Sequence, residues 1–263
     1  MDQFLLFGDS ITQQSFSQSQ PPGRGGFAFN AALSNAYIRR LDIVNRGLSG
    51  YNTTQALRVL PQVIPRPETA RLRFLTVFFG ANDARLPNTP GSPQQSVDLP
   101  LYMENLRQII QHPCVQAHEG TRIIVITPPP VEERLGLQID KLDAPEILAP
   151  KRTALNAGNY AEAAKGVAGE MNVACLDLWS FMMERAGFIA AKYQAQHDLP
   201  GSLVVEENEM LRSWLHDGLH FSPAGYEILY EALMDLISKV WPDQLPENLP
   251  MVLPDWKDES AWR

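Results

Sequence analysis

The chain has 263 residues, of which 44% are hydrophobic and 20% charged, a composition typical of a soluble globular protein with a large buried core. Its 22 Lys and Arg residues against 30 Asp and Glu give a net charge of -8, which argues against nucleic acid and anionic membrane surfaces as partners. No run approaches the ~18 apolar residues of a membrane span, and no basic segment precedes the first apolar run, so we expect no stable membrane insertion and a cytoplasmic location.

Short apolar runs alternate with longer amphipathic stretches along the chain. The β-type runs lie at residues 4–7, 42–45, 74–79, 122–127 and 173–176, and the helical patterns at 27–39, 53–60, 99–112, 151–171 and 223–240. Runs that are apolar throughout are typical of parallel strands buried on both faces. The order of elements predicts a single-domain α/β fold, a doubly wound, flavodoxin-like sandwich with a mostly parallel sheet of about five strands flanked by helices.

The last predicted helix separates the main domain from a tail. Ser222 is a good N-cap, Pro223 suits the first helical position, and Trp241-Pro242 stops the helix. We therefore assign one domain to residues 1–241 and a Pro-rich C-terminal tail to residues 242–263. The tail carries many large apolar side chains, which favours packing on the body or, in a homodimer, on a partner subunit. Its acidic residues leave a disordered tail as the alternative.

Ser10 follows the first predicted strand within two residues, in the stretch FLLFGDSITQQSF that begins at Phe4. In an open parallel sheet, reactive groups collect at the carboxyl ends of the strands. If residues 11–15 begin a helical turn, the Ser10 N–H also lies at a helix N-terminus, where negative charge is favoured. Ser10 is therefore a candidate nucleophile, and the competing interpretation is a helix cap.

A serine nucleophile needs a base, and His220 is the best placed of the five histidines. The stretch DGLHFSP puts Asp217 three residues before it in a Gly-containing turn, so the carboxylate can hold one ring nitrogen while the other points outward. His216 is adjacent to Asp217, but neighbouring side chains in an extended loop diverge, so we rank it below His220. We likewise rank Asp9, the residue next to Ser10, below Asp217.

Two further strand ends carry groups that can donate hydrogen bonds to an oxyanion. Gly50, in NRGLSGYNTT, permits the close backbone approach that an N–H donor needs, and Asn82, in FFGANDA, offers a side-chain amide. A turn glycine and an Asx turn explain the two residues separately. Three strand ends that supply a hydroxyl, a glycine and an amide favour one common site.

Together these stretches resemble the GDSL, or SGNH, hydrolase superfamily, whose four signature blocks are matched in order by FGDSIT, NRGLSGYNT, FFGANDA and DGLHFSP. The resemblance implies Ser10 as nucleophile and Asp217 and His220 as the other triad members. It also implies that Ser10 N–H, Gly50 N–H and the Asn82 side chain are the oxyanion donors. A carboxylic ester hydrolase of this kind uses no cofactor and no metal, and the chain has neither a GxxxxGK[ST] nor an HExxH motif.

The stretches FFGANDARLP, PLYMENLRQII and ITPPPVEE extend the likeness to the isoamyl acetate-hydrolysing esterase branch. This likeness implies a small ester substrate, an acetate of a small alcohol. A polar, Pro-containing insert at residues 135–150 departs from the match, and because loops after strands build the pocket, the alcohol side stays open. A carbohydrate O-acetylesterase, a lysophospholipase and a thioesterase are alternatives on the same fold, and a non-catalytic binding protein is a remote one.

Overall fold

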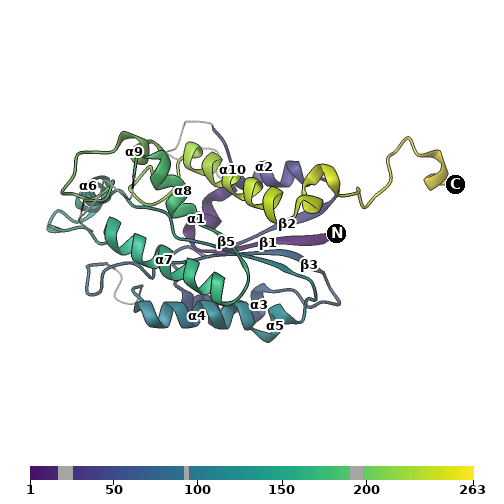
Figure 1. Ribbon diagram of the computed structural model, residues 1–263, viewed down its shortest axis with the longest axis horizontal. Coiled ribbons are helices and arrows are strands. Elements are labelled where there is room, and N and C mark those ends of the chain that lie inside the picture. The colour runs from purple at the N-terminus through teal and green to yellow at the C-terminus, as the bar shows by residue number, and fades with distance from the viewer. Residues whose placement is uncertain (17–25, 92–94, 190–197) are drawn as a thin grey trace.

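The computed structural model describes residues 1–16, 26–91, 95–189 and 198–263, and its centre is one five-stranded parallel sheet (Figure 1). The strands are β1 (Asp2–Gly8), β2 (Leu41–Gly47), β3 (Leu72–Phe78), β4 (Arg122–Ile126) and β5 (Ala174–Leu176). Their order in space is β2-β1-β3-β4-β5, and every neighbouring pair is parallel. The predicted strands and the doubly wound α/β class are confirmed.

The inner strands are largely apolar because helices cover both faces of the sheet, whereas the edge strand β2 carries polar residues and is mostly half-buried. In β1, Phe4 and Leu6 belong to the core on one face and Leu5 and Phe7 to the core on the other, and each is at most 2% exposed. The first face is covered by α2 (Phe29–Ala36), α8 (Leu178–Arg185), α9 (Glu209–Trp214) and α10 (Pro223–Val240). The second is covered by α3 (Thr53–Val63), α4 (Leu99–Gln111), α5 (Pro113–Gln116) and α7 (Ala154–Glu170).

The five predicted helices appear as α2, α3, α4, α7 and α10, with ends shifted by a few residues. α10 begins as expected: Pro223 is its first residue, and the Ser222 side chain accepts a hydrogen bond from the Gly225 N–H. No helix in the described part of the chain is both long enough and apolar enough to cross a membrane.

The helix α6 (Glu133–Asp143) is not expected from the sequence, and it overlaps the polar insert at residues 135–150. Leu135, Ile139 and Leu142 recur at helical spacing in this helix, but Glu133 is its only buried residue, so the apolar pattern does not mark a face that packs in the core. Its first turn is held instead by the Glu132 side chain, which accepts a hydrogen bond from the Leu135 N–H. The short helices α5, α8 and α9 are also absent from the prediction.

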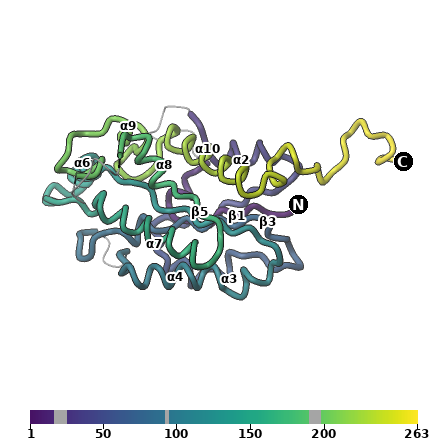
Figure 2. The backbone as a smooth tube through the Cα atoms, in the orientation of Figure 1, coloured from purple at the N-terminus to yellow at the C-terminus, as the bar shows by residue number. Residues whose placement is uncertain are grey.

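The C-terminal segment has two parts of different character. Residues 242–249 lie on the body, where the Tyr37 hydroxyl donates to the Gln244 carbonyl and Leu249 is 7% exposed. From residue 251 onward every residue is exposed, and the chain extends away from the body (Figures 1 and 2). Contact of this second part with a partner subunit stays a prediction.

Candidate active site

Three of the predicted site residues follow strands that are neighbours in the sheet. Gly8, the last residue of β1, pairs with the last residue of β2 and with the last residue of β3, so the three strands end at the same edge. Ser10 lies just beyond β1, Gly50 just beyond β2 and Asn82 just beyond β3. A hydroxyl, a glycine and a side-chain amide therefore share the carboxyl end of the sheet.

Ser10 is the first residue of the short helix α1 (Ser10–Gln13) and is 5% exposed. The N-cap of this helix is Asp9, whose Oδ1 accepts a hydrogen bond from the Ile11 N–H at 2.9 Å, so the interpretation of Ser10 as the cap is wrong. Because the first N–H groups of a helix have no intrahelical acceptor, the Ser10 N–H is available to a ligand. The Ser10 hydroxyl is not used for capping either.

Two glycines make the turn into α1 possible. A Cβ on Gly8 would stand 2.0 Å from Thr12 Oγ1, and a Cβ on Gly47 would stand 2.0 Å from the Gln13 backbone nitrogen. Both contacts are far shorter than any side chain tolerates, so only glycine at these positions lets α1 fold back over the ends of β1 and β2.

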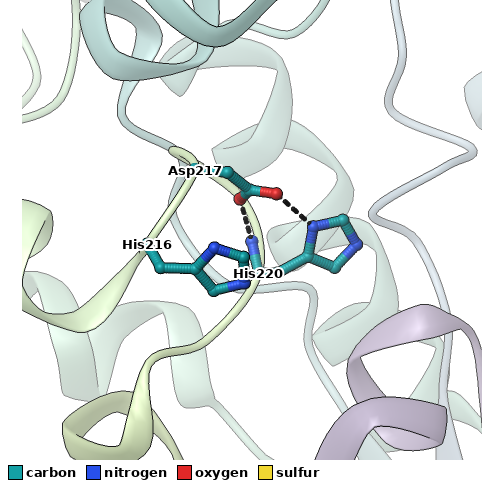
Figure 3. Close-up of side chains that lie close together, drawn as sticks. All are labelled: His216, Asp217 and His220. Carbon is teal, nitrogen blue, oxygen red and sulfur yellow. Dashed lines mark hydrogen bonds and ion pairs between the residues drawn. The ribbon is translucent and has the colours of Figure 1, made fainter. Parts of the chain in front are cut away.

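The Ser10 hydroxyl is hydrogen-bonded to His220, and His220 to Asp217. Ser10 Oγ lies 2.8 Å from His220 Nε2, and His220 Nδ1 lies 2.6 Å from Asp217 Oδ2. Figure 3 shows the Asp217 carboxylate directed at both the ring and the backbone nitrogen of His220. The fold thus brings a serine and a histidine 210 positions apart into direct contact.

A tight turn holds Asp217 against His220. Asp217 Oδ1 accepts hydrogen bonds from the N–H groups of Leu219 at 2.9 Å and of His220 at 2.7 Å. Gly218 has a φ of +85°, and a Cβ there would lie 2.5 Å from the Glu132 carbonyl oxygen. The Glu132 N–H in turn donates to the Gly218 carbonyl at 2.9 Å. The turn is therefore docked on the residue that precedes α6.

The two acids near Ser10 differ in their electrostatics. Burial by itself raises the pKa of Asp217, but the hydrogen bond and the charge of His220 outweigh it and hold that pKa below its usual range. Burial raises the pKa of Asp9 to about 6, and the Asp9 carboxylate is hydrogen-bonded to the backbone of α1. The acid in contact with the histidine is Asp217, which is ionised at neutral pH.

The His216 side chain lies beside these residues without joining their side-chain hydrogen bonds (Figure 3), although the His216 N–H donates to the His220 carbonyl at 3.0 Å. Its ring stacks on that of His220 with 6.0 Å between the centroids, its Nε2 has no partner among the described residues, and burial lowers its pKa. His216, Asp217 and His220 present ligand atoms within 4.8 Å of one another, which is a spacing that suits a metal ion. Asp217 and His220 are hydrogen-bonded to each other, and His220 is also hydrogen-bonded to Ser10. These ligand atoms are therefore already engaged in hydrogen bonds.

Gly50 and Asn82 form the second side of the site. Gly50 has a φ of +82°, a conformation that favours glycine, and its N–H has no acceptor among the described residues. Asn82 is 3% exposed, and its Nδ2 donates to the carbonyl of Tyr51 at 3.0 Å. Because Tyr51 directly follows Gly50, this bond ties the loop after β2 to the loop after β3.

Three polar side chains near Asn82 are not among the residues expected from the sequence. Arg152 and Gln95 donate to its Oδ1, and Asp83 accepts hydrogen bonds from the backbone and hydroxyl of Thr53 at the start of α3. Asp83 is fully buried, and burial raises its pKa to about 7. Its place inside FFGANDA is a signal that could have drawn attention to it. Arg152 and Gln95 stand in no motif, so no comparable signal exists for them.

A pocket of about 170 Å³ lies directly beside His220. Leu137 and Ile139 of α6 contribute apolar side chains to its wall, and Arg152 contributes a cationic one. Residues 135–150, expected to influence the alcohol side, thus border the candidate site as a helix and the segment after it.

The GDSL-like lipase/acylhydrolase family model matches residues 6–228. The isoamyl acetate-hydrolyzing esterase 1 homolog of Rattus norvegicus is 35% identical over 97% of this chain and 86% of its own. The isoamyl acetate-hydrolyzing esterase of Saccharomyces cerevisiae is 32% identical over 98% of this chain and 94% of its own.

Among solved structures, a lipase/acylhydrolase from Enterococcus faecalis has a TM-score of 0.57 at 22% identity, covering 97% of this chain and 100% of that one. A catalytic mutant of an acetylxylan esterase from Geobacillus stearothermophilus has a TM-score of 0.60 at 20% identity, covering 90% and 94%.

Proposed function

Because this chain belongs to the GDSL-like lipase/acylhydrolase family and is a carboxylic ester hydrolase, we propose that it hydrolyses short-chain esters, such as acetates of small alcohols, through an acyl-enzyme on Ser10. The observation that carries the proposal is the continuous line of hydrogen bonds from Ser10 Oγ through the His220 ring to Asp217. A hydroxyl that faces an imidazole held by a carboxylate is the arrangement that activates a serine nucleophile.

His220 moves the protons in the proposed reaction. Its Nε2 accepts the proton of Ser10 while Oγ attacks the ester carbonyl carbon, and the imidazolium then gives that proton to the leaving alcohol oxygen. Asp217 holds Nδ1–H and stabilises the imidazolium between the two transfers. In the second half, His220 takes a proton from water, the resulting hydroxide attacks the acyl carbon, and the proton returns to Ser10 Oγ as the acid leaves.

The oxyanion of each tetrahedral intermediate is held by three N–H groups: those of Ser10 and Gly50, and Nδ2 of Asn82. The Ser10 N–H lies at the N-terminus of α1, where the helix dipole favours negative charge, although a helix this short adds little. The loops that carry Gly50 and Asn82 are joined by the bond to Tyr51, so the donors are placed before substrate arrives.

The pocket beside His220 suits the alcohol portion of the substrate. Because His220 protonates the leaving oxygen, the alcohol has to lie against its ring during the first step. The pocket wall carries Leu137 and Ile139 but also the charged side chains of Asp140, Lys151 and Arg152, so its volume of about 170 Å³ suits a small alcohol without selecting an apolar one. The esterases of the isoamyl acetate type that cover nearly the whole chain support acetates as the acyl side.

The proposal is tested with a panel of esters in which acyl length and alcohol vary separately, and Ser10→Ala serves as the control variant. We expect the highest kcat/KM for acetyl esters of small alcohols and no measurable turnover by Ser10→Ala. Wild-type hydrolysis by Ser10→Ala would overturn the mechanism. Preference for acetylated xylose, a lysophospholipid or an acyl thioester would assign the corresponding alternative substrate, and failure of a fluorophosphonate to label Ser10 would favour a non-catalytic protein.

We also propose that residues 251–263 join two copies of the chain in a homodimer. The segment carries exposed Val252, Leu253, Trp256 and Trp262 at the end of an extended chain that leaves the body. Apolar side chains gathered in this way are unfavourable in water and favour burial against a partner. The cytoplasmic location stays a prediction.

A further inference from the structure

Three hydrogen bonds hold the buried Asn82 side chain. Its Oδ1 accepts from Arg152 Nη2 at 3.0 Å and from Gln95 Nε2 at 3.1 Å, and its Nδ2 donates to the Tyr51 carbonyl at 3.0 Å. An amide nitrogen carries two hydrogens, so one N–H of Asn82 is left over after the bond to Tyr51. No residue in the described ranges accepts that hydrogen, which leaves it for an oxyanion.

Arg152 and the Tyr51 carbonyl together determine which end of the Asn82 amide is the oxygen. A guanidinium has five N–H donors and no acceptor, so the Asn82 atom that faces it has to be the carbonyl oxygen. Without the donors Arg152 and Gln95, only the Tyr51 carbonyl would oppose a half-turn of the amide, and such a half-turn would present the amide oxygen to the oxyanion, which it would repel. Arg152 is itself held in place because its Nε donates to the Ala81 carbonyl at 2.8 Å.

The orientation of the Gln95 amide is fixed in the same way, by a second arginine, Arg85. Its Oε1 accepts a hydrogen bond from Arg85 Nη1 at 3.0 Å, so its Nε2 is the end that faces the site. That nitrogen donates to Asn82 Oδ1 and to the Gly50 carbonyl, each at 3.1 Å. Gln95 therefore connects two proposed oxyanion donors without using the N–H group of either.

Arg152 also places a positive charge next to the Asn82 amide. Burial lowers the pKa of Arg152 to about 10, which leaves the guanidinium protonated at neutral pH, with the carboxylates of Asp9 and Asp140 nearby. A charged donor on the amide oxygen polarises the amide and increases the partial positive charge on its nitrogen. Asn82 then donates a stronger hydrogen bond to an oxyanion than an amide without this partner.

We propose that Arg152 and Gln95 are positioning residues that hold Asn82 with its amide nitrogen toward the oxyanion, and that Gln95 holds Gly50 in the same frame. The inference rests on the proposed function, because it requires Asn82 and Gly50 as oxyanion donors. It goes further in assigning a role to two residues that lie outside all four signature blocks.

The test is a double-mutant cycle on the full chain with p-nitrophenyl acetate as substrate. Asn82→Ala is expected to lower kcat by about 10²–10³-fold. Arg152→Met is expected to lower kcat by about 10–100-fold with KM within about threefold, because the oxyanion exists only in the transition state and the intermediates. In the Asn82→Ala background, Arg152→Met is expected to cost less than about threefold, because the residue through which Arg152 acts is gone.

Two conservative variants keep the test decisive if Arg152→Met folds poorly. Arg152→Lys retains the charge and a donor, and we expect it to regain about tenfold in kcat over Arg152→Met. Gln95→Glu keeps the shape of the side chain but replaces the donor nitrogen by an oxygen that repels Asn82 Oδ1, and we expect a loss of about 10–100-fold in kcat. Arg73→Met is the matched control, since Arg73 is hydrogen-bonded to Gln244 at the opposite end of β3, and its kcat should equal that of the wild type.

Equal losses from Arg152→Met in both backgrounds would overturn the inference, because the effect would then not pass through Asn82. Wild-type kcat in both Arg152→Met and Gln95→Glu would overturn it as well. Either result leaves the proposed function standing as long as Ser10→Ala and Asn82→Ala are impaired. If Ser10→Ala or Asn82→Ala keeps wild-type activity, the proposed function fails and the inference fails with it.

Discussion

The two ends of the parallel sheet use histidine in opposite ways. At the carboxyl end, His220 lies between a carboxylate and a hydroxyl, with its Nε2 2.8 Å from Ser10 Oγ. At the amino end, His118 lies between two backbone groups: its Nδ1 accepts from the Leu72 N–H at 3.2 Å, and its Nε2 lies 2.8 Å from the Pro65 carbonyl. Each imidazole joins segments that are far apart in the chain.

The two histidines differ in what their partners can do next. A backbone N–H or carbonyl needs one hydrogen bond and then has no further chemistry, so His118 completes the hydrogen bonding of buried groups. In the proposed mechanism, the Ser10 hydroxyl gives its proton to His220, and the charge of Asp217 stabilises the imidazolium that this transfer forms. The partners of a histidine, more than its burial, therefore separate a structural from a chemical role.

The comparison predicts that substitution of His220 lowers kcat and that substitution of His118 lowers the free energy of unfolding. His220→Gln is expected to lower kcat by about 10⁵-fold or more, because Ser10 loses its base, with the free energy of unfolding within about 1 kcal/mol of the wild type. His118→Leu is expected to lower the free energy of unfolding by about 1–3 kcal/mol, because the Leu72 N–H loses its buried acceptor, and to leave kcat within about threefold. Ester hydrolysis and urea unfolding measure both. A large loss of kcat in His118→Leu at unchanged stability would contradict the comparison.

Asp217 and Asp9, both at the carboxyl end of the sheet, differ in the same way: Asp217 contacts the His220 ring, and Asp9 contacts backbone. Asp217→Asn is expected to lower kcat by about 10⁴-fold, because an amide at this position favours the wrong tautomer of His220. Asp9→Asn keeps an oxygen that can accept from the Ile11 N–H, so we expect a loss in kcat of less than about tenfold. Steady-state kinetics on both variants provide the measurement, and comparable losses would show that the acid next to Ser10 has a catalytic role.

Asp83 lies at the carboxyl end of the sheet, but like His118 at the amino end it accepts a hydrogen bond from a buried backbone N–H. Its Oδ1 accepts from the Thr53 N–H at 2.9 Å, and burial raises its pKa from 3.8 to about 7. Between these values the folded protein binds a proton that the unfolded chain has released, so the stability due to this group is complete below pH 4 and is lost as the pH rises through about 7.

Asp83→Asn keeps the acceptor for Thr53 and removes the titration. We therefore expect the free energy of unfolding to fall less between about pH 4 and 7 in Asp83→Asn than in the wild type. Urea unfolding at several pH values measures the two slopes, and Asp98→Asn, which changes an exposed acid, is the matched control. Parallel curves for Asp83→Asn and the wild type would mean that Asp83 is ionised in the folded protein throughout.

The smallest effect on stability is expected from the C-terminal segment, which leaves the body at the amino end of the sheet. The Val252 N–H donates to the carbonyl of Arg39, just before β2 begins. Deletion of residues 251–263 is expected to lower the melting temperature by about 2–4 °C, because the body buries none of the deleted side chains and the loss is limited to the bonds with Arg39 and to the association of two copies. Light scattering should show a dimer for the full chain and a monomer for the deletion variant. A monomeric full chain would refute the proposed dimer.

Local features of the sequence determined the strands and the edge at which the site lies. Apolar runs of strand length, separated by amphipathic stretches, identify all five strands, because burial on both faces leaves a pattern in each strand by itself. Ser10, Gly50 and Asn82 could be picked out because each follows such a strand and stands in a recognisable block. α6 carries Leu135, Ile139 and Leu142 at helical spacing, but the polar residues and prolines of residues 135–150 favour the interpretation of this stretch as an insert.

The tertiary structure alone decided how the side chains at that edge are used. It brought His220 to Ser10, 210 positions away in the chain, and placed Arg152 on the oxygen of Asn82, 70 positions away. Hydrogen bonds of this kind depend on the directions of side chains from separate segments, and those directions are set by how the whole core packs. No periodicity or spacing along the chain encodes them.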